Sequence, residues 1–265
     1  MNTQPEQARH IIRFCQGLLS HVEDTIAMEH PVTIKINGEE FVTLVCTPEF
    51  IEDMVIGYLA SEGIIRHMQD IQHIWTQEEE GFVHVTTKRW NPLHRQLFAK
   101  RYVTSCCGSG RHSFVYVNDA RTAKHTHGEP IELRYADCFR LMNTVLSGTE
   151  LFQHTGGVHT AALCSNKDVL LTRSDIGRHN ALDKILGHYL RQGIPPEHST
   201  IVLSGRISSE ILLKASKLGA EIVLSKSAPT SLAIDLADEL GITAVGFIRA
   251  DVCNVYSHPE RITAD

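Results

Sequence analysis

Residues 200–248 read TIVLSGRISSEILLKASKLGAEIVLSKSAPTSLAIDLADELGITAVGFI, and this stretch decides the fold. Three short apolar runs, typical of buried strands, alternate in it with two helical patterns. The predicted elements are, in chain order, a strand at 200–204, a helix at 208–218, a strand at 221–225, a helix at 230–240 and a strand at 243–248. Strands separated by helices of this length need crossover connections, which predicts a largely parallel sheet with helices on its faces.

The same alternation extends toward the N-terminus. We predict a helix near 132–146, a β pair at 158–164 and 168–173, and a helix at 178–191. Residues 132–265 are therefore expected to form one α/β domain with helices on both faces of the sheet.

The first part of the chain has a different pattern. Residues 32–47 form two alternating runs around Asn37-Gly38, which predicts a hairpin. We expect a helix to follow, capped by Thr47, with Pro48 in its first turn, an apolar stripe and an end at Gly63. The stripe consists of Phe50, Ile51, Met54, Val55, Tyr58 and Leu59.

Short strands are predicted at 71–75 and 82–87. Residues 1–111 then make a smaller α+β domain, and the polar stretch 112–131 reads as a mobile linker. Length alone allows one large domain or two unequal ones.

The composition is that of an ordinary soluble globular protein. The chain of 265 residues is 42% apolar and 21% charged, with a net charge of −6. No basic balance favours a nucleic-acid or membrane partner. The first residues do not read as a secretory signal, and we expect no bilayer-spanning run. We expect a cytoplasmic protein whose seven scattered cysteines remain thiols.

Polar residues gather where the predicted strands end. The junctions read SDIGRHNALDK, GRISSE, LSKSAPTS and IRADVCN. Ligands of open α/β sheets bind at this edge, where helix N-termini offer free N–H groups. Ser208 and Thr230 could be plain helix caps and Pro229 a helix start. Three arginines at one edge, Arg178, Arg206 and Arg249, favour phosphate or another anion, which predicts a nucleotide-like ligand.

The histidines of the stretch FQHTGGVHTAALC, His154 and His159, could be metal ligands. The glycine pair between them would let backbone approach a ligand, or it forms a tight turn. A zinc nucleobase deaminase needs an H-x-E and a P-C-x-x-C string, and the sequence has neither. We therefore expect no metal site.

Two kinds of cysteine can be distinguished. Cys46, Cys138 and Cys164 lie in apolar runs and are predicted to be buried and structural. Cys106 and Cys107 lie in TSCCGSGR, residues 104–111, where the turn and its arginine favour a reactive thiolate. Adjacent cysteines form only strained disulfides. A sulfur carrier, a redox sensor and a metal chaperone all fit this chemistry.

Several strings together resemble the FdhD/NarQ family of formate dehydrogenase accessory sulfurtransferases over nearly the whole chain. They are TPEF, GYLASEGII, TSCCGSG, TGGVHTAAL, DIGRHNALDKILG, LSGRISSE, SAPTSLAIDLA and GFIRADVCNVY. The resemblance implies a sulfur relay in which a cysteine desulfurase passes sulfur to a cysteine of this protein. The protein then carries it as a persulfide to the molybdenum cofactor, molybdenum bis(molybdopterin guanine dinucleotide). It also implies a cytidine-deaminase-like C-terminal domain of three layers, α/β/α, without the zinc.

Carried over by position, the resemblance makes Cys107 the sulfur-bearing residue. Where most of the family has a second cysteine, this chain has Gly110. Either one sulfur is enough or Cys106 assists; we favour the first, because one thiolate can carry a sulfane sulfur.

The family's cofactor-contacting segment falls on Phe247, Ile248, Arg249, Ala250, Asp251 and Val252. To these we add the strand-end residues Arg178, His179, Arg206, Ser225 and Ser227. In this assignment Arg249 meets phosphate and Asp251 accepts from a guanine edge.

The sequence thus predicts a sulfurtransferase required for formate dehydrogenase activity. Its expected partners are the desulfurase, the formate dehydrogenase apoenzyme and, on general grounds, a second copy of the chain. The alternative is a chaperone that binds the cofactor without covalent chemistry. A nucleobase hydrolase is disfavoured by the missing zinc strings.

Overall fold

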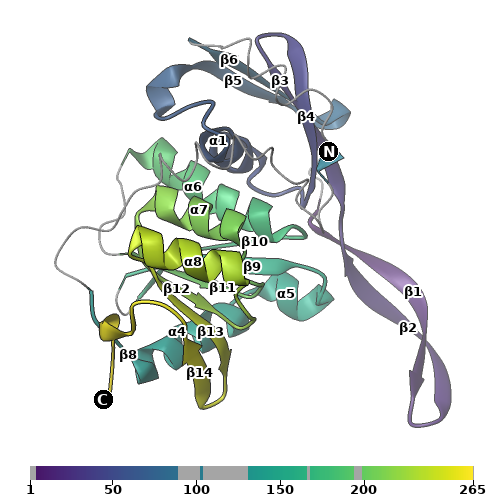
Figure 1. Ribbon diagram of the computed structural model, residues 1–265. Helices are drawn as coiled ribbons and strands as arrows, with labels where there is room; N and C mark the ends of the chain where they lie inside the picture. Colours follow the sequence, from purple (N-terminus) through teal and green to yellow (C-terminus); the bar gives the residue numbers. More distant parts are fainter. Residues whose placement is uncertain (1–3, 89–101, 104–130, 166–167, 194–198, 265) are drawn as a thin grey trace.

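The protein is seen here in a computed structural model that describes residues 4–88, 102–103, 131–165, 168–193 and 199–264. Two sheets form the framework, and a long hairpin projects from them (Figure 1). No helix in these ranges is both long and apolar enough to span a bilayer. The linker predicted at 112–131 lies, except for its last residue, outside the described residues.

The larger sheet has six strands in the order β10-β9-β11-β12-β13-β14. Their bounds are β9 His159–Cys164, β10 Val169–Asp175, β11 Ser199–Leu203, β12 Ala220–Ser225, β13 Thr243–Arg249 and β14 Val252–Val255. β11, β12 and β13 are parallel, as their crossover helices require, which confirms the predicted α/β class. β9 and β14 run the opposite way because short turns join them to β10 and β13.

Helices cover both faces of this sheet and make three layers (Figure 1). α6 (Arg178–Gln192), α7 (Ser209–Leu218) and α8 (Ser231–Leu240) enclose one apolar core with the sheet, and α4 (Tyr135–Ser147) encloses another on the opposite face. The predicted caps are confirmed, since Ser208 and Thr230 each accept a backbone N–H of the first turn. The short α5 (Glu150–Thr155) and the small pair β8 (Leu133–Arg134) with β15 (Ile262–Thr263) were not predicted.

The smaller sheet has five strands in the order β5-β6-β3-β4-β7. They are β3 His30–Ile36, β4 Glu39–Cys46, β5 Ile71–Gln77, β6 Phe82–Thr87 and β7 Tyr102–Val103; short 3-10 turns at Met68–Asp70, Glu78–Glu80 and Pro259–Arg261 complete the elements. The predicted hairpin is confirmed: Asn37 and Gly38 have φ of 50° and 88°, the left-handed values that a two-residue hairpin turn needs.

One helix, α1 (Ile51–Ser61), joins the two halves of the molecule. It packs its apolar side on the smaller sheet and lies against α6 of the larger one (Figure 1). A Cβ atom on Gly57 would lie 1.9 Å from the backbone oxygen of Asp183, and one on Gly187 would lie 1.8 Å from that of Asp53. The helices therefore meet backbone to backbone, which only glycine permits at these two positions.

The start of α1 differs from the prediction. Its N-cap residue is Phe50, in the left-handed region with φ of 52°, whose side chain forms no capping hydrogen bond. The hydroxyl of Thr47, expected there, donates instead to Asp175, 128 residues away in sequence. Phe50, predicted in the apolar stripe, is half exposed, with the guanidinium of Arg173 3.8 Å from its ring centroid. The predicted end at Gly63 is confirmed by the hydrogen bond from its N–H to Ala60.

The projecting hairpin was not predicted at all. β1 (Glu6–Cys15) and β2 (Leu18–Ala27) pair over their full length around Gln16 and Gly17. Large apolar side chains near its tip stay 63% to 75% exposed; they are Ile12, Phe14, Leu18 and Leu19. At its base Glu6 lies 3.3 Å from Nδ1 of His154 on α5. The hairpin is thus held by its base and by its own ladder.

Candidate functional site

Four strands of the larger sheet end at the same edge. β10 runs in the direction of β11, since both are antiparallel to β9, and β12 and β13 are parallel to β11. Residues expected to bind a ligand lie at these strand ends: Arg178 and Arg206 follow β10 and β11, and Arg249 is the last residue of β13. The structure therefore places the three arginines along one edge, which we call the strand-end edge. Their part in binding stays a prediction.

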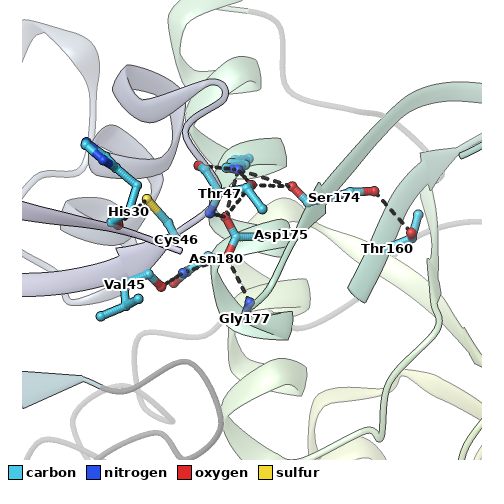
Figure 2. A network of polar contacts seen from close by, with 10 residues as sticks. His30, Val45, Cys46, Thr47, Thr160, Ser174, Asp175, Gly177 and Asn180 are labelled. Carbon is cyan, nitrogen blue, oxygen red and sulfur yellow. Dashed lines mark hydrogen bonds and ion pairs between the residues drawn. The ribbon is translucent and has the colours of Figure 1, made fainter. Parts of the chain in front are cut away.

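A buried polar network supports this edge at the end of β10 (Figure 2). One carboxylate oxygen of Asp175 accepts from the N–H of Gly177 at 2.8 Å and from the side-chain amide of Asn180 at 2.9 Å. The amide of Asn180 also donates to the carbonyl of Val45. Asp175 and Asn180 thereby fix the turn that starts α6, and so the positions of Arg178 and His179 within it.

The other oxygen of Asp175 connects to the N-terminal half of the chain. It accepts from the N–H and the hydroxyl of Thr47, both at 3.0 Å, and lies 2.7 Å from Nζ of Lys184. Lys184 has no exposed side-chain surface, and its ammonium group also donates to the Thr47 hydroxyl at 2.7 Å and the Ser174 carbonyl at 3.1 Å. Each charge is paired and hydrogen-bonded, as burial demands.

The start of α6 presents Arg178 and His179 beyond this network. Nε of Arg178 is buried and has no hydrogen-bond partner among the residues that the structure describes. His179 lies 3.3 Å from the carboxylate of Glu210 on α7. Of these two expected cofactor contacts, His179 thus faces a carboxylate of the chain, whereas Nε of Arg178 is a donor that a ligand could meet.

The loops after β11 and β12 are tied to each other. The hydroxyl of Ser225 donates to the Gly205 carbonyl at 2.7 Å and accepts from the N–H of Ser227 at 2.9 Å. Ser225 is fully buried, so the structure gives this expected cofactor contact a supporting position between the loops. Ser227 is partly accessible and Arg206 is exposed.

The corner between β13 and β14 is strained. Phe247 and Ala250 have φ of 54° and 45°, unusual for residues with side chains, and the strand pairing shifts between Gly246 and Arg249. A hydrogen bond from the Phe247 N–H to the Ser227 carbonyl holds the corner against the neighbouring loop. Strained backbone persists where surrounding contacts impose it, and it concentrates at functional sites.

This corner exposes most of the expected cofactor segment. The side chains of Arg249, Ala250, Asp251 and Val252 are exposed, and the guanidinium of Arg249 lies 5.7 Å from the ring centroid of Phe247. Ile248 differs, because its side chain is buried in the core beneath α4. Any contact of Ile248 with a ligand would have to come from its backbone.

The expected sulfur carrier, Cys107, and its neighbours Cys106 and Gly110 lie outside the described residues. The prediction for Cys46, Cys138 and Cys164 is confirmed: all three are buried. Burial raises the pKa of each thiol to about 12, so they stay protonated and unreactive at neutral pH. Cys15 is exposed, and burial raises the pKa of the half-buried Cys253.

Sequence reasoning missed two parts of the site. The ion pair of Asp175 with Lys184 and their contacts with Thr47 join strings far apart in the chain, TPEF and DIGRHNALDK. The only signal in the sequence that could have indicated this contact is that both strings occur in the same chain. His159 was considered only as a metal ligand, yet it lies at the strand-end edge opposite Asp175. Among the residues that the structure describes, no three His, Cys, Asp or Glu side chains are grouped to hold a metal ion.

The sequence matches the model of the FdhD/NarQ family over residues 27–263. The sulfur carrier protein FdhD of Bacillus subtilis (strain 168) is 52% identical over 262 residues, 99% of each chain. That of Shouchella clausii (strain KSM-K16) is 49% identical over 263 residues, 99% of this chain and 98% of its own.

A solved structure, described as that of a formate dehydrogenase accessory protein from Desulfotalea psychrophila, has a similar fold. It matches with a TM-score of 0.78, covering 98% of this chain and 100% of its own. At 23% identity this likeness concerns the fold alone.

Proposed function

Because this chain belongs to the FdhD/NarQ family, we propose that it is a sulfur carrier that matures the molybdenum cofactor of formate dehydrogenase. Cys107 receives sulfur from a cysteine desulfurase and holds it as a persulfide. The strand-end edge binds the recipient, molybdenum bis(molybdopterin guanine dinucleotide), as a substrate. Two relatives about half identical to this chain over almost all its length are named sulfur carrier proteins, which supports the carrier role.

Cofactor binding is supported above all by one observation: the strand-end edge has guanidinium groups without an ion-pair partner among the described residues. Arg178, Arg206 and Arg249 form no ion pair with any described residue, and the buried Nε of Arg178 lacks a hydrogen-bond partner. A guanidinium group binds phosphate through paired N–H donors, and helix N-termini add backbone donors. A dinucleotide with several phosphates fits such an edge.

Two further groups at this edge have separate roles, one in binding guanine and one in supporting the start of α6. Asp251 is exposed beside Arg249, and its carboxylate can accept the two N–H donors of a guanine edge. The Asp175 network holds the start of α6 in place without competing for the ligand, because both oxygens of its carboxylate are already bonded within the chain. The strand-end edge thus combines a rigid hydrogen-bonded network, which supports it, with arginine donors that are available to a ligand.

The covalent step starts from the thiolate of Cys107. It attacks the terminal sulfur of the donor's persulfide; a new bond forms between the two sulfurs, and the donor cysteine leaves as a thiolate. Cys107 then carries the sulfane sulfur to the bound cofactor. Only one thiolate is needed for this carriage, which fits a chain with Gly110 where most of the family has a second cysteine.

The remaining parts of the proposal concern location and partners. We place the protein in the cytoplasm, where thiols stay reduced. It meets the desulfurase and the formate dehydrogenase apoenzyme there, and acts as a homodimer.

Mass spectrometry after incubation with a cysteine desulfurase and cysteine tests the carrier role. Cys107 should gain the mass of one sulfur atom, and a thiol reductant should remove it. Cys107→Ser should abolish the gain, whereas the matched variant Cys106→Ser should keep it. No gain on Cys107, together with retained cofactor binding, would favour the chaperone that works without covalent chemistry.

A further inference from the structure

His159 occupies a distinctive position at the strand-end edge. It is the first residue of β9 and pairs across the sheet with Asp175, the last residue of β10. A Cβ atom on Gly205, in the loop after β11, would lie 3.2 Å from Nδ1 of His159 and 3.4 Å from Cδ of Arg178. The imidazole ring and the arginine side chain therefore converge on the same bare stretch of backbone.

Both side chains have unused hydrogen-bonding capacity. Neither ring nitrogen of His159 forms a hydrogen bond with a described residue, and Nε of Arg178 is buried without a partner. Asp175, the nearby carboxylate, has both oxygens bonded to the Thr47, Gly177, Asn180 and Lys184 groups. Within the part of the chain that the structure describes, no carboxylate forms a hydrogen bond or ion pair with His159 or Arg178, so their donors can meet a ligand.

The charged groups that act on His159 are Arg178 on α6 and Asp175 on β10. Burial and then the positive charge of Arg178 lower the pKa of His159 below its usual value, and Asp175 raises it only partly in return. The imidazole is therefore neutral at neutral pH, with one nitrogen donating and the other accepting.

We propose that His159 and Arg178 form a phosphate-binding pair, in which the imidazole donates a hydrogen bond to the same phosphate group that the guanidinium holds. The proposal rests on the function proposed above and adds His159 to the residues that contact the cofactor's phosphates. It assigns a ligand contact to the TGGVH string. It also makes the binding of phosphate dependent on pH.

The sign of that dependence follows from linkage. A bound phosphate favours the protonated imidazole, so binding raises the pKa of His159, and protonation of His159 in turn strengthens binding. The affinity for phosphate therefore increases as the pH falls through the lowered pKa that His159 has in the free protein. If binding raises the pKa by about one unit, the gain is about tenfold.

The test measures the affinity of the full chain for GDP by calorimetry between about pH 5.5 and pH 8. Phosphate itself titrates near pH 6, so the readout is the ratio of variant to wild-type affinity at each pH. His159→Gln keeps a donor that cannot titrate, and should match the wild type at high pH but lose about tenfold at low pH. His159→Ala should lose about three- to tenfold at high pH as well.

The matched control is His154→Gln, which makes the same change at a half-exposed histidine paired with Glu6. Its affinity ratio should stay near one at every pH. As a second measurement that needs no variant to fold well, the ring resonance of His159 followed by NMR should show a pKa raised by about one unit when GDP is bound.

Two results would overturn the proposal. A His159→Gln profile parallel to that of the wild type, with no GDP-induced change in the pKa of His159, removes His159 from the site. If Arg249→Ala still weakens GDP binding in that case, the proposed function stands. If neither GDP nor inorganic pyrophosphate binds the wild type, the phosphate pair and the proposed cofactor site both fail.

Discussion

Charged side chains behave differently in two neighbouring regions of this protein. Between the halves of the molecule three buried carboxylates each meet a cation: Asp175 meets Lys184, Asp183 meets Lys214 at 2.5 Å, and Asp53 meets Arg191 at 2.8 Å. At the strand-end edge Arg178, Arg206 and Arg249 meet no carboxylate of the described chain. The paired charges join the two halves of the molecule, and the unpaired ones are those that we propose bind a ligand.

The largest effect is expected where a pair is broken in the buried region. Lys184→Met leaves the carboxylate of Asp175 buried without its cation, which should lower the free energy of unfolding by about 3–5 kcal/mol. Urea denaturation measures it. The matched variant Lys226→Met removes an exposed lysine and should change stability by less than about 0.5 kcal/mol. Equal changes in the free energy of unfolding for the two variants would show that the buried network does not stabilise the protein more than an exposed lysine does.

At the strand-end edge the expected effect is on binding and not on stability. Arg206→Ala should leave the free energy of unfolding within about 0.5 kcal/mol of the wild type. Its affinity for GDP should fall by about 1.5–3 kcal/mol, or roughly ten- to a hundredfold, because a charged hydrogen bond to phosphate is lost.

The control for this variant is Arg13→Ala, which removes an arginine paired with Asp24 on the hairpin. Its affinity for GDP should be unchanged. A loss of stability without a loss of affinity in Arg206→Ala would place Arg206 with the structural charges instead.

The smallest effect is expected at Asp137, whose pair partners Arg134 and Arg140 are half exposed. Hydrogen bonds from Arg134 above all, and also from Arg140, hold the pKa of Asp137 below its usual value. The carboxylate thus adds stability that is present above its unfolded pKa, about 3.9, and lost as pH falls through the lower folded value.

Asp137→Asn should therefore cost about 1 kcal/mol or less at pH 7, since solvent screens such pairs. The difference from the wild type should shrink toward pH 2. Thermal unfolding at several pH values measures both. Asp235→Asn, on the exposed side of α8, is the control and should show no such change. A constant difference at all pH values would rule out the charge as its cause.

Local signals predicted most of the elements well. The turn at Asn37-Gly38, the caps Ser208 and Thr230 and the strand–helix alternation after residue 200 all act over a few residues, and the structure follows them closely. The N-terminal hairpin escaped prediction because its strands have exposed apolar residues on both faces, and the alternation that marks a half-buried strand is absent.

Thr47 shows why the candidate site was harder to predict than the fold. By sequence it is a good helix cap, and nothing nearby argues otherwise. In the structure its hydroxyl donates to Asp175 and accepts from Lys184. These bonds matter because a buried ion pair stabilises the chain only when its remaining donors and acceptors are satisfied. A long-range requirement of this kind leaves no local pattern.

The sequence by itself determined the α/β class, the strand–helix order and the family, since these follow from periodicity, turn chemistry and strings of residues that can be read along the chain. It also determined that Arg178, Arg206 and Arg249 lie where strands end. Only the tertiary structure decided which charges are paired, that Gly57 and Gly187 bring α1 against α6, and that His159 lies beside Arg178. Those outcomes depend on which segments meet in space, where burial and distance fix the energy of each contact.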